Sequence, residues 1–291
     1  MRDDLIINFT PTGMVPQKGM NPAVPISPEE IVDSVSEAVE LGITLAHLHA
    51  REPDGTPSSS RDIYEKILSG VRSRHPELVV CVSLSGRKSG DFATRTQPID
   101  FSGELKPDLG SLTLSSLNFP GQASVNAPEM IRALALKMQA QRVVPELEIF
   151  DLGMINYFRY LMERQLLQGP FYANILLGNI AGAQADLLQA GLLIRDLPAG
   201  TLWSLGGIGA AQLEANTMAI LAGGGVRVGL EDNLYWDASR SRTTTNRELL
   251  TRVHQLAAIF GRRAMSPAEL RLRLQLEPGF GRYGRKVEAE A

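Results

Sequence analysis

Hydrophobic and polar positions follow two regular patterns along the chain. Short apolar runs predict buried strands, and longer segments with apolar residues at helical spacing predict amphipathic helices. The predicted strands cover residues 5–9, 43–49, 78–84, 109–114, 143–150, 171–177, 201–205 and 223–231. The predicted helices cover residues 28–41, 58–74, 127–141, 151–167, 184–193, 210–221, 246–261 and 265–276, and a polar loop follows the third strand to about residue 98.

Strict alternation of strand and helix predicts a parallel sheet, and eight strands favour a single-domain α/β (β/α)8 TIM barrel. An open, doubly wound sheet is the alternative. Polar residues gather where the predicted strands end, and a closed barrel would bring those ends together on one face. We expect one barrel over residues 1–276, including the extra helix, and a polar, frayed tail over 277–291.

The strongest candidate for chemistry is His47-Leu-His49, at the end of the second predicted strand. Side chains alternate along a strand, so both imidazoles would leave from the same face. Two neutral imidazoles side by side can be adjacent ligands for a metal such as zinc. The alternative is that one packs in the core and the other is solvated.

A carboxylate partner is predicted at the end of the eighth strand, in Gly223-Gly-Gly-Val-Arg-Val-Gly-Leu-Glu-Asp-Asn233. Two histidines and Glu231 would form a ligand set with open positions, as in catalytic metal sites. Asp232, next to the metal without being a ligand, would suit a general base. The alternative is that either acid only caps the following segment.

Arg227 lies inside a strand that should be apolar, and a buried arginine needs an anionic partner. That partner could be Glu148, Asp232 or the carboxylate of a substrate. Ser83 could hydrogen-bond a substrate oxygen or only form a turn. Gly206 and Gly207 precede a helix, where backbone N–H groups can hold a phosphate.

Composition limits the classes of function. The net charge is −3 without a basic block, which argues against nucleic-acid binding. No apolar run is long enough to cross a membrane, and we recognise no signal peptide. A single cysteine, Cys81, suits a reducing cytoplasm, so a cytoplasmic protein is expected.

Several motifs together resemble the β-keto acid cleavage enzymes. They are Thr10-Pro-Thr-Gly13, Val24-Pro-Ile-Ser-Pro-Glu-Glu30, His47-Leu-His-Ala-Arg51, Ser111-Leu-Thr113 with Asn118-Phe119, Pro145-Glu-Leu-Glu-Ile-Phe-Asp151 and Val226-Arg-Val-Gly-Leu-Glu-Asp-Asn233. The resemblance extends over nearly the whole chain, from about residue 5 to 276. It implies a TIM barrel, zinc or another divalent metal, and exchange of a β-keto acid with acetyl-CoA to give acetoacetate and a new acyl-CoA. It also implies a homo-oligomer, a tetramer in the family.

By the same resemblance, the metal ligands fall on His47, His49 and Glu231. The catalytic residues fall on Asp232, Arg227, Ser83 and Glu148, with Glu146 as the less favoured alternative to Glu148. Substrate contacts are expected from Thr113, Asn118, Gly206, Gly207 and Met14. Met14 departs from the family member that binds an amino-substituted substrate, which has a glutamate there, so a neutral or apolar β-keto acid is expected.

Three other interpretations compete with this hypothesis. An amidohydrolase-type metal hydrolase would carry its His-x-His on the first strand and further histidines later, which this chain lacks. An aldolase or lyase of the 3-hydroxy-3-methylglutaryl-CoA lyase type would act without acetyl-CoA as co-substrate. A barrel that binds a ligand without catalysis is the third.

Overall fold

Eight parallel strands form a closed barrel in a computed structural model that describes residues 4–87 and 89–286. Their order around the barrel is β1-β2-β5-β6-β9-β10-β11-β12, with β12 pairing β1. The strands are β1 (Ile7–Phe9), β2 (Leu45–Leu48), β5 (Val79–Val82), β6 (Leu109–Thr113), β9 (Val144–Ile149), β10 (Tyr172–Leu177), β11 (Leu202–Gly207) and β12 (Gly225–Val228). The prediction of a TIM barrel is therefore confirmed, and the open sheet is excluded.

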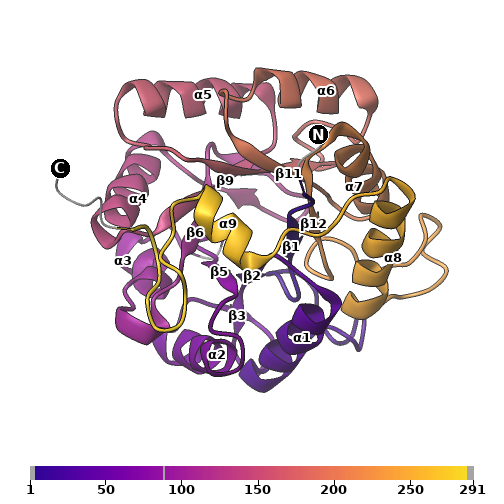
Figure 1. The fold of residues 1–291 in the computed structure, drawn as a ribbon, viewed down its shortest axis with the longest axis horizontal. Coiled ribbons are helices and arrows are strands. Elements are labelled where there is room, and N and C mark those ends of the chain that lie inside the picture. Colours follow the sequence, from indigo (N-terminus) through magenta and orange to yellow (C-terminus); the bar gives the residue numbers. More distant parts are fainter. Residues whose placement is uncertain (1–3, 88, 287–291) are drawn as a thin grey trace.

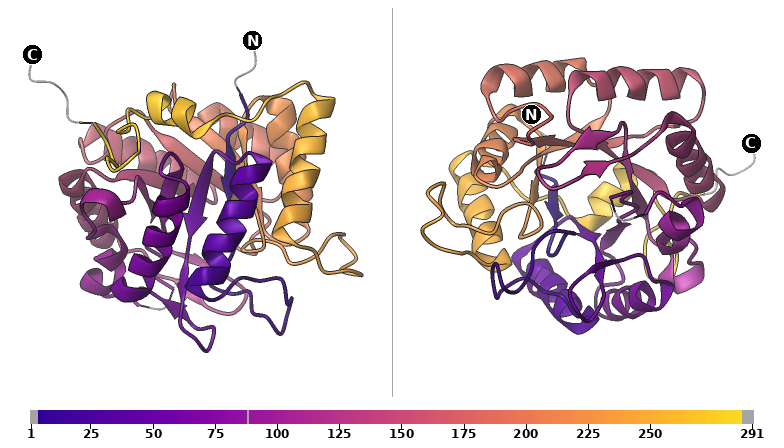
Figure 2. Two further views of the ribbon diagram at one scale, coloured as in Figure 1. Left: turned by 60° about the horizontal axis from the view of Figure 1, so that its bottom comes forward. Right: turned by 180° about the vertical axis from the view of Figure 1, so that it is seen from behind.

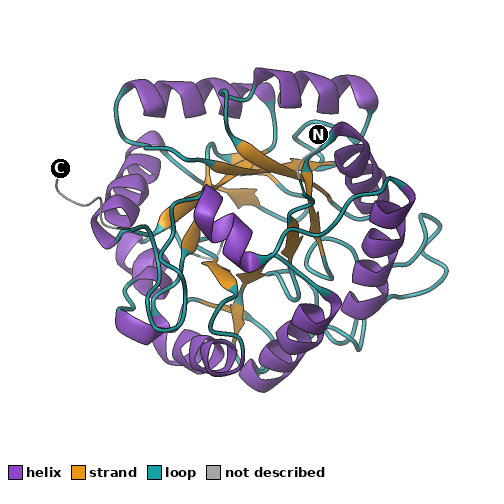
Figure 3. Ribbon diagram, in the orientation of Figure 1, coloured by secondary structure: helices purple, strands orange, loops and turns teal. Residues whose placement is uncertain are grey.

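Helices surround the barrel on its outside, apart from the last one, which lies across one end (Figure 3). They are α1 (Pro28–Leu41), α2 (Arg61–Arg74), α3 (Phe92–Thr96), α4 (Pro128–Gln141), α5 (Leu152–Glu163), α6 (Leu187–Asp196), α7 (Ala211–Ala222), α8 (Asn246–Ile259) and α9 (Pro267–Arg273). The α1 helix begins with a capping box, in which Ser27 and Glu30 satisfy each other's backbone N–H groups. The α3 helix lies where a polar loop was predicted, because five residues are too few for a helical period to be visible.

Short elements outside the barrel lie in the loops. β3 (Ala50–Arg51) pairs β4 (Pro57–Ser58), and β7 (Leu117–Asn118) pairs β8 (Ala123–Ser124). Two 3₁₀ turns follow α3, at Gln97–Ile99 and Gly103–Leu105. Among the described residues, no helix has the length and apolar character to cross a membrane.

The α9 helix covers the amino-terminal end of the barrel, where it lies across the strands in Figure 1. Leu270 and Leu274 pack there against Leu45, Val79 and Leu109 in a separate apolar cluster. The opposite end carries the long loops after β1 and β12 (Figure 2). These loops follow the carboxyl ends of the strands, where TIM-barrel enzymes carry their active sites.

The segment after α9 is not frayed as far as residue 286. Leu276 and Gly279 form bridges with Arg285 and Arg282, and Tyr283 is buried. The backbone N–H of Gly284 donates to Asp108 over 3.1 Å. This part of the expected tail is fixed because it closes the amino-terminal end of the barrel; residues 287–291 lie outside the described part.

Asp108 holds this end of the barrel together. Its carboxylate, fully buried, accepts hydrogen bonds from Arg72 at 3.0 Å and from Arg271 at 2.9 Å. Burial alone would raise the pKa of Asp108, but the two guanidinium groups outweigh it and hold that pKa below its usual value. The two guanidinium groups thus share a counter-charge only while Asp108 is ionised.

We expect Asp108→Asn to lower the free energy of unfolding by about 3–5 kcal/mol, because it leaves two buried guanidinium groups without a counter-charge. In the wild type this stabilisation is fully present when the pH is above the ordinary pKa of an aspartate. It disappears as the pH falls through the lowered pKa of Asp108. Urea unfolding at neutral pH measures the change. Loss of less than about 1 kcal/mol would show that the arginines are solvated instead.

Candidate active site

His47, His49 and Glu231 come together at the carboxyl end of the barrel. His47 lies on β2, His49 directly follows it, and Glu231 lies in the loop after β12. The His47 and His49 Nε2 atoms are 3.1 Å apart, and His49 Nε2 is 3.1 Å from Glu231 Oε1. All three side chains are largely buried, and the second Glu231 oxygen is buried without a hydrogen-bond partner. Three converging donor atoms with an unsatisfied carboxylate oxygen fit a divalent metal.

Glu146 fixes the orientation of His47 from inside the barrel. Its carboxylate is 2.5 Å from His47 Nδ1 and also accepts from Asn8 Nδ2 at 2.7 Å. Burial would lower the pKa of His47, but Glu146 and Glu231 outweigh it and raise that pKa. A carboxylate that holds one imidazole nitrogen leaves the other aimed at a metal. Glu146 therefore lies at the site, although the sequence favoured Glu148 over it.

Arg227 joins the two acids that follow β12. Its Nε donates to Asp232 at 2.8 Å and its Nη2 to Glu231 at 2.7 Å. The structure thus gives Arg227 internal partners, while its buried Nη1 lies 3.7 Å from Glu148 and makes no hydrogen bond. Both interpretations of this arginine are compatible with its position.

The surroundings shift the pKa values of the two acids in opposite directions. Burial raises the pKa of Asp232, and neighbouring Glu231 adds to this, although Arg227 opposes it. Burial acts on Glu231 in the same direction, but Arg227, His49 and His47 outweigh it and hold its pKa well below the usual value. Glu231 is therefore suited to be a permanently ionised ligand, and Asp232 to exchange a proton.

A cavity of about 710 Å³ opens beside these groups. Ser83 and Thr113 line it at the ends of β5 and β6, and Glu148 lines it from β9. Thr113 donates to Glu148 over 2.6 Å, which fixes both side chains at the wall. The structure thus brings Ser83, Thr113 and Glu148 together with Arg227, Asp232 and two of the ligand residues.

A loop between β1 and α1 covers one side of this cavity. Met14 lines the cavity, and Gly13 packs so closely on Glu231 that a Cβ there would lie 2.4 Å from the Glu231 Cγ. Arg51 holds the loop, donating to the Gly13 and Pro16 carbonyls at 2.7 Å each. Sequence reasoning gave Arg51 and Gly13 no role beyond their motifs.

Three predicted substrate-binding residues are not at the cavity. Asn118 is exposed on β7, and only its carbonyl is engaged, by Asn179. A Cβ at Gly206 would be 3.1 Å from the Arg227 side chain, and one at Gly207 would be 2.2 Å from the Ala211 backbone. These glycines make room for neighbouring groups. The following N–H groups, of Ile208 and Gly209, already donate to Leu177 and Asp232, so these two donors are not available to a phosphate.

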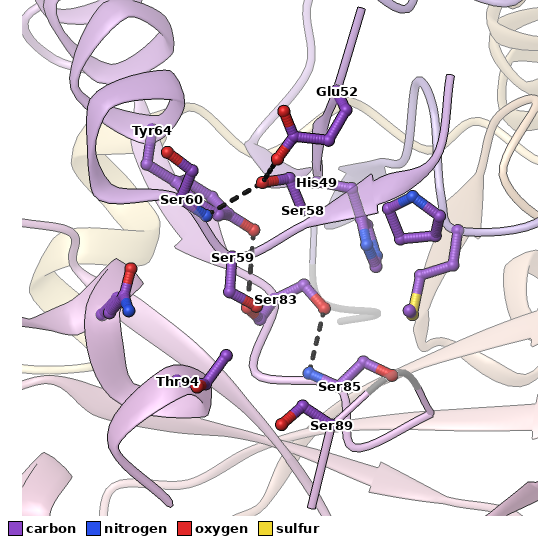
Figure 4. A pocket seen from close by; sticks show the side chains of 13 residues that line it. His49, Glu52, Ser58, Ser59, Ser60, Tyr64, Ser83, Ser85, Ser89 and Thr94 are labelled. Carbon is purple, nitrogen blue, oxygen red and sulfur yellow. Dashed lines mark hydrogen bonds between the residues drawn. The ribbon is translucent and has the colours of Figure 1, made fainter. Parts of the chain in front are cut away.

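A second cavity of about 350 Å³ meets the first, since Met14, His49, Ser83 and Ser85 line both. Figure 4 shows its hydroxyl-rich wall, with Ser58 linked to Glu52 and Ser83 linked to Ser85. The site is therefore a branched cavity, with His49 at the junction.

A closed (β/α)8 barrel with two histidines, a carboxylate and a neighbouring acid at the ends of its strands defines a barrel enzyme with a candidate metal centre. The model of the β-keto acid cleavage enzymes matches residues 4–276. The chain belongs to this family, and the resemblance inferred from its motifs is confirmed.

Relatives of known name extend over nearly the whole chain. A 3-keto-5-aminohexanoate cleavage enzyme of Fusobacterium nucleatum is 34% identical and covers 95% of this chain and 100% of its own length. A 3-oxoadipate:acetyl-CoA acetyltransferase of Cupriavidus necator is also 34% identical, covering 95% and 96%. The apo structure of ObcA has the same fold, with a TM-score of 0.76 and 21% identity over 87% of this chain and 65% of that one.

Proposed function

We propose that the protein is a metal-dependent enzyme that converts a β-keto acid and acetyl-CoA into acetoacetate and a new acyl-CoA. One observation carries the proposal: two histidine nitrogens and a carboxylate oxygen converge beside the Arg227–Asp232 pair in the cavity of a β-keto acid cleavage family member. The name of the Cupriavidus relative supports acetyl-CoA as co-substrate.

The reaction exchanges one carbon–carbon bond for another. C2 of the β-keto acid forms a bond to the acetyl carbonyl carbon as the bond between that carbon and the CoA sulfur breaks. The released CoA sulfur then attacks C3, and the bond between C2 and C3 breaks, giving acetoacetate. The acyl group that contained C3 is transferred to the CoA sulfur. No oxidant or reductant is needed, and one proton leaves C2 and is later returned.

His47, His49 and Glu231 would hold zinc or another divalent metal, which when bound stabilises negative charge on the substrate oxygens. Asp232 accepts the C2 proton, in keeping with its raised pKa. Arg227 holds Asp232 in place, and its Nη1, which makes no hydrogen bond, attracts the substrate carboxylate. Ser83 donates a hydrogen bond to a substrate oxygen, and Glu148 with Thr113 positions the substrate at the opposite wall.

The test of this function is a panel of β-keto acids with and without acetyl-CoA, in which acetoacetate is measured. We expect acetoacetate only when both substrates are present. Consumption of a β-keto acid without acetyl-CoA would favour a lyase instead, and no turnover of any acid would favour a binding protein.

Met14, in this proposal, selects against substrates whose chain carries an amine. A thioether offers no charge to an ammonium group, and burying an ammonium group without a carboxylate costs several kcal/mol. We expect 3-keto-5-aminohexanoate to have a kcat/KM at least about tenfold below that of an uncharged acid of equal length. Met14→Glu should narrow or reverse this difference.

Wild-type preference for the amine would contradict the role of Met14. The Met14→Leu variant is the matched control, because it keeps an apolar side chain of similar size and should leave the order of the two substrates unchanged.

We also propose a cytoplasmic homo-oligomer, a tetramer in keeping with the family. The lone cysteine, Cys81, is buried and reduced. Ile180, Leu187 and Leu188 are more than half exposed, with exposed fractions of 66%, 74% and 72%, and an interface between copies would cover them. Light scattering that gives the mass of a single chain would contradict the oligomer.

A further inference from the structure

Arg87 is a cation at the cavity wall whose guanidinium has no hydrogen-bond partner in the described part of the chain. It follows β5 by a few residues, is half-buried and lines the larger cavity. Its guanidinium carbon lies 3.5 Å above the centre of the Phe119 ring. Within residues 4–87 and 89–286 its guanidinium makes no hydrogen bond or ion pair, whereas nearby Arg95 donates to Leu84 and Asn126.

The acids around Arg87 are already engaged. Arg227 holds Glu231 and Asp232, and Thr113 donates to Glu148. Burial lowers the pKa of Arg87, and Glu148, Glu231 and Asp232 only partly offset this. A partly desolvated cation with free donors requires an anion from outside the chain.

The stack on Phe119 presents the guanidinium as a planar fork. Cation–π contact fixes the plane of an arginine while its N–H edges remain available, and such a fork matches the two oxygens of a carboxylate. Arg87 also lines the same cavity as His49, Glu231 and Asp232, so an anion bound to it would share that cavity with the metal-ligand group. The anion therefore belongs to a short molecule that reaches both the metal and Arg87. The phosphates of CoA are separated from its thioester by the long pantetheine arm and fit this position less well.

We infer that Arg87 binds a second carboxylate at the far end of the β-keto acid, so that the preferred substrates are β-keto dicarboxylic acids. This inference rests on the proposed function and changes the expectation of a wholly neutral chain. The methylene groups would lie against Met14 and neighbouring apolar residues, and the charged end would lie on Arg87.

The test measures binding, not turnover. Calorimetry of the zinc-loaded protein compares a six-carbon β-keto acid ending in a second carboxylate with the matched acid ending in a methyl group. The wild type should bind the diacid about 10- to 100-fold more tightly, the range of a hydrogen bond to a charged group. Arg87→Gln should remove this preference while binding of the monoacid stays within about twofold.

Arg240 provides the charge-matched control. It lines the same cavity but is exposed at its rim, so Arg240→Gln should keep the preference for the diacid. Arg87→Lys should retain only part of the preference, since a point charge does not replace a planar fork.

Equal binding of the two acids by the wild type, or an undiminished preference in Arg87→Gln, would overturn the inference. A rise in the KM for acetyl-CoA in Arg87→Gln, with the diacid preference intact, would overturn it as well and assign Arg87 to the thioester. Failure of the proposed function is seen separately, as absence of acetoacetate while the binding preference persists.

Discussion

Replacing His47 and His49 by alanine is expected to remove the bound metal and all acetoacetate formation together. The two Nε2 atoms are 3.1 Å apart, and Glu231 alone cannot hold a divalent ion at ordinary concentrations. Each single variant should already lose most of the metal, because three protein ligands become two. Elemental analysis of the dialysed protein measures the metal, and the acetoacetate assay measures the activity.

His75→Ala is the matched control for these variants. His75 follows α2 and contacts Ser36 at 3.0 Å, away from the site, so this variant should keep both metal and turnover. A stoichiometric metal in the His47→Ala, His49→Ala double variant would contradict the assignment of the ligands.

Asp232→Asn is expected to lower kcat by about 10²–10⁴-fold, the usual range for general acid–base catalysis, while the metal stays bound. The amide keeps the shape of the side chain but cannot accept the C2 proton. Arg227→Lys should also lose most activity, because an ammonium group cannot contact Asp232 and Glu231 as the guanidinium does, at 2.8 and 2.7 Å. The effect is measured as the kcat of Asp232→Asn relative to the wild type, with elemental analysis showing that both contain the same amount of metal.

Asp33→Asn changes an exposed aspartate, the partner of Arg74, in the same way and serves as the control, with wild-type turnover expected. Near-normal kcat in Asp232→Asn would exclude Asp232 as the base and transfer the role to Glu148, the other acid at the cavity wall.

The placement of His47, His49, Arg227 and Asp232 at one end of the barrel could be predicted because it follows from topology. In a parallel barrel every carboxyl end lies on the same face, so residues distant in sequence meet there. The strand carrying Arg227, however, ends at Val228 and not at residue 231. A turn at Gly229, where φ is +155° and a Cβ would lie 2.1 Å from the Thr10 carbonyl oxygen, brings Glu231 and Asp232 back onto Arg227. The contacts of Arg227 with these two acids therefore depend on the turn and not on the strand alone.

Depth inside the barrel could not be predicted from the pattern. Glu146 and Glu148 lie two residues apart on one face of β9, and sequence reasoning treated them as alternatives. In the barrel they belong to successive layers, so Glu146 reaches His47 below the site and Glu148 lines the cavity above it. Both glutamates have a place, since inward-facing residues of a barrel stack in layers.

Contacts made by loops were also beyond sequence reasoning. Arg51 binds the carbonyl oxygens of Gly13 and Pro16, and backbone acceptors leave no trace in side-chain identity. The sequence also does not distinguish two possible roles of Gly206 and Gly207, because a glycine that admits a neighbouring side chain looks like one that admits a ligand.

The most direct test of the central claim follows the acetyl carbons of acetyl-CoA labelled with ¹³C in both positions. The proposed exchange predicts that the label appears in C3 and C4 of acetoacetate, while the acyl group of the new acyl-CoA comes from the β-keto acid and carries none. Mass spectrometry and ¹³C NMR of the products distinguish the positions. Consumption of the β-keto acid with all label remaining in acetyl-CoA would contradict the account.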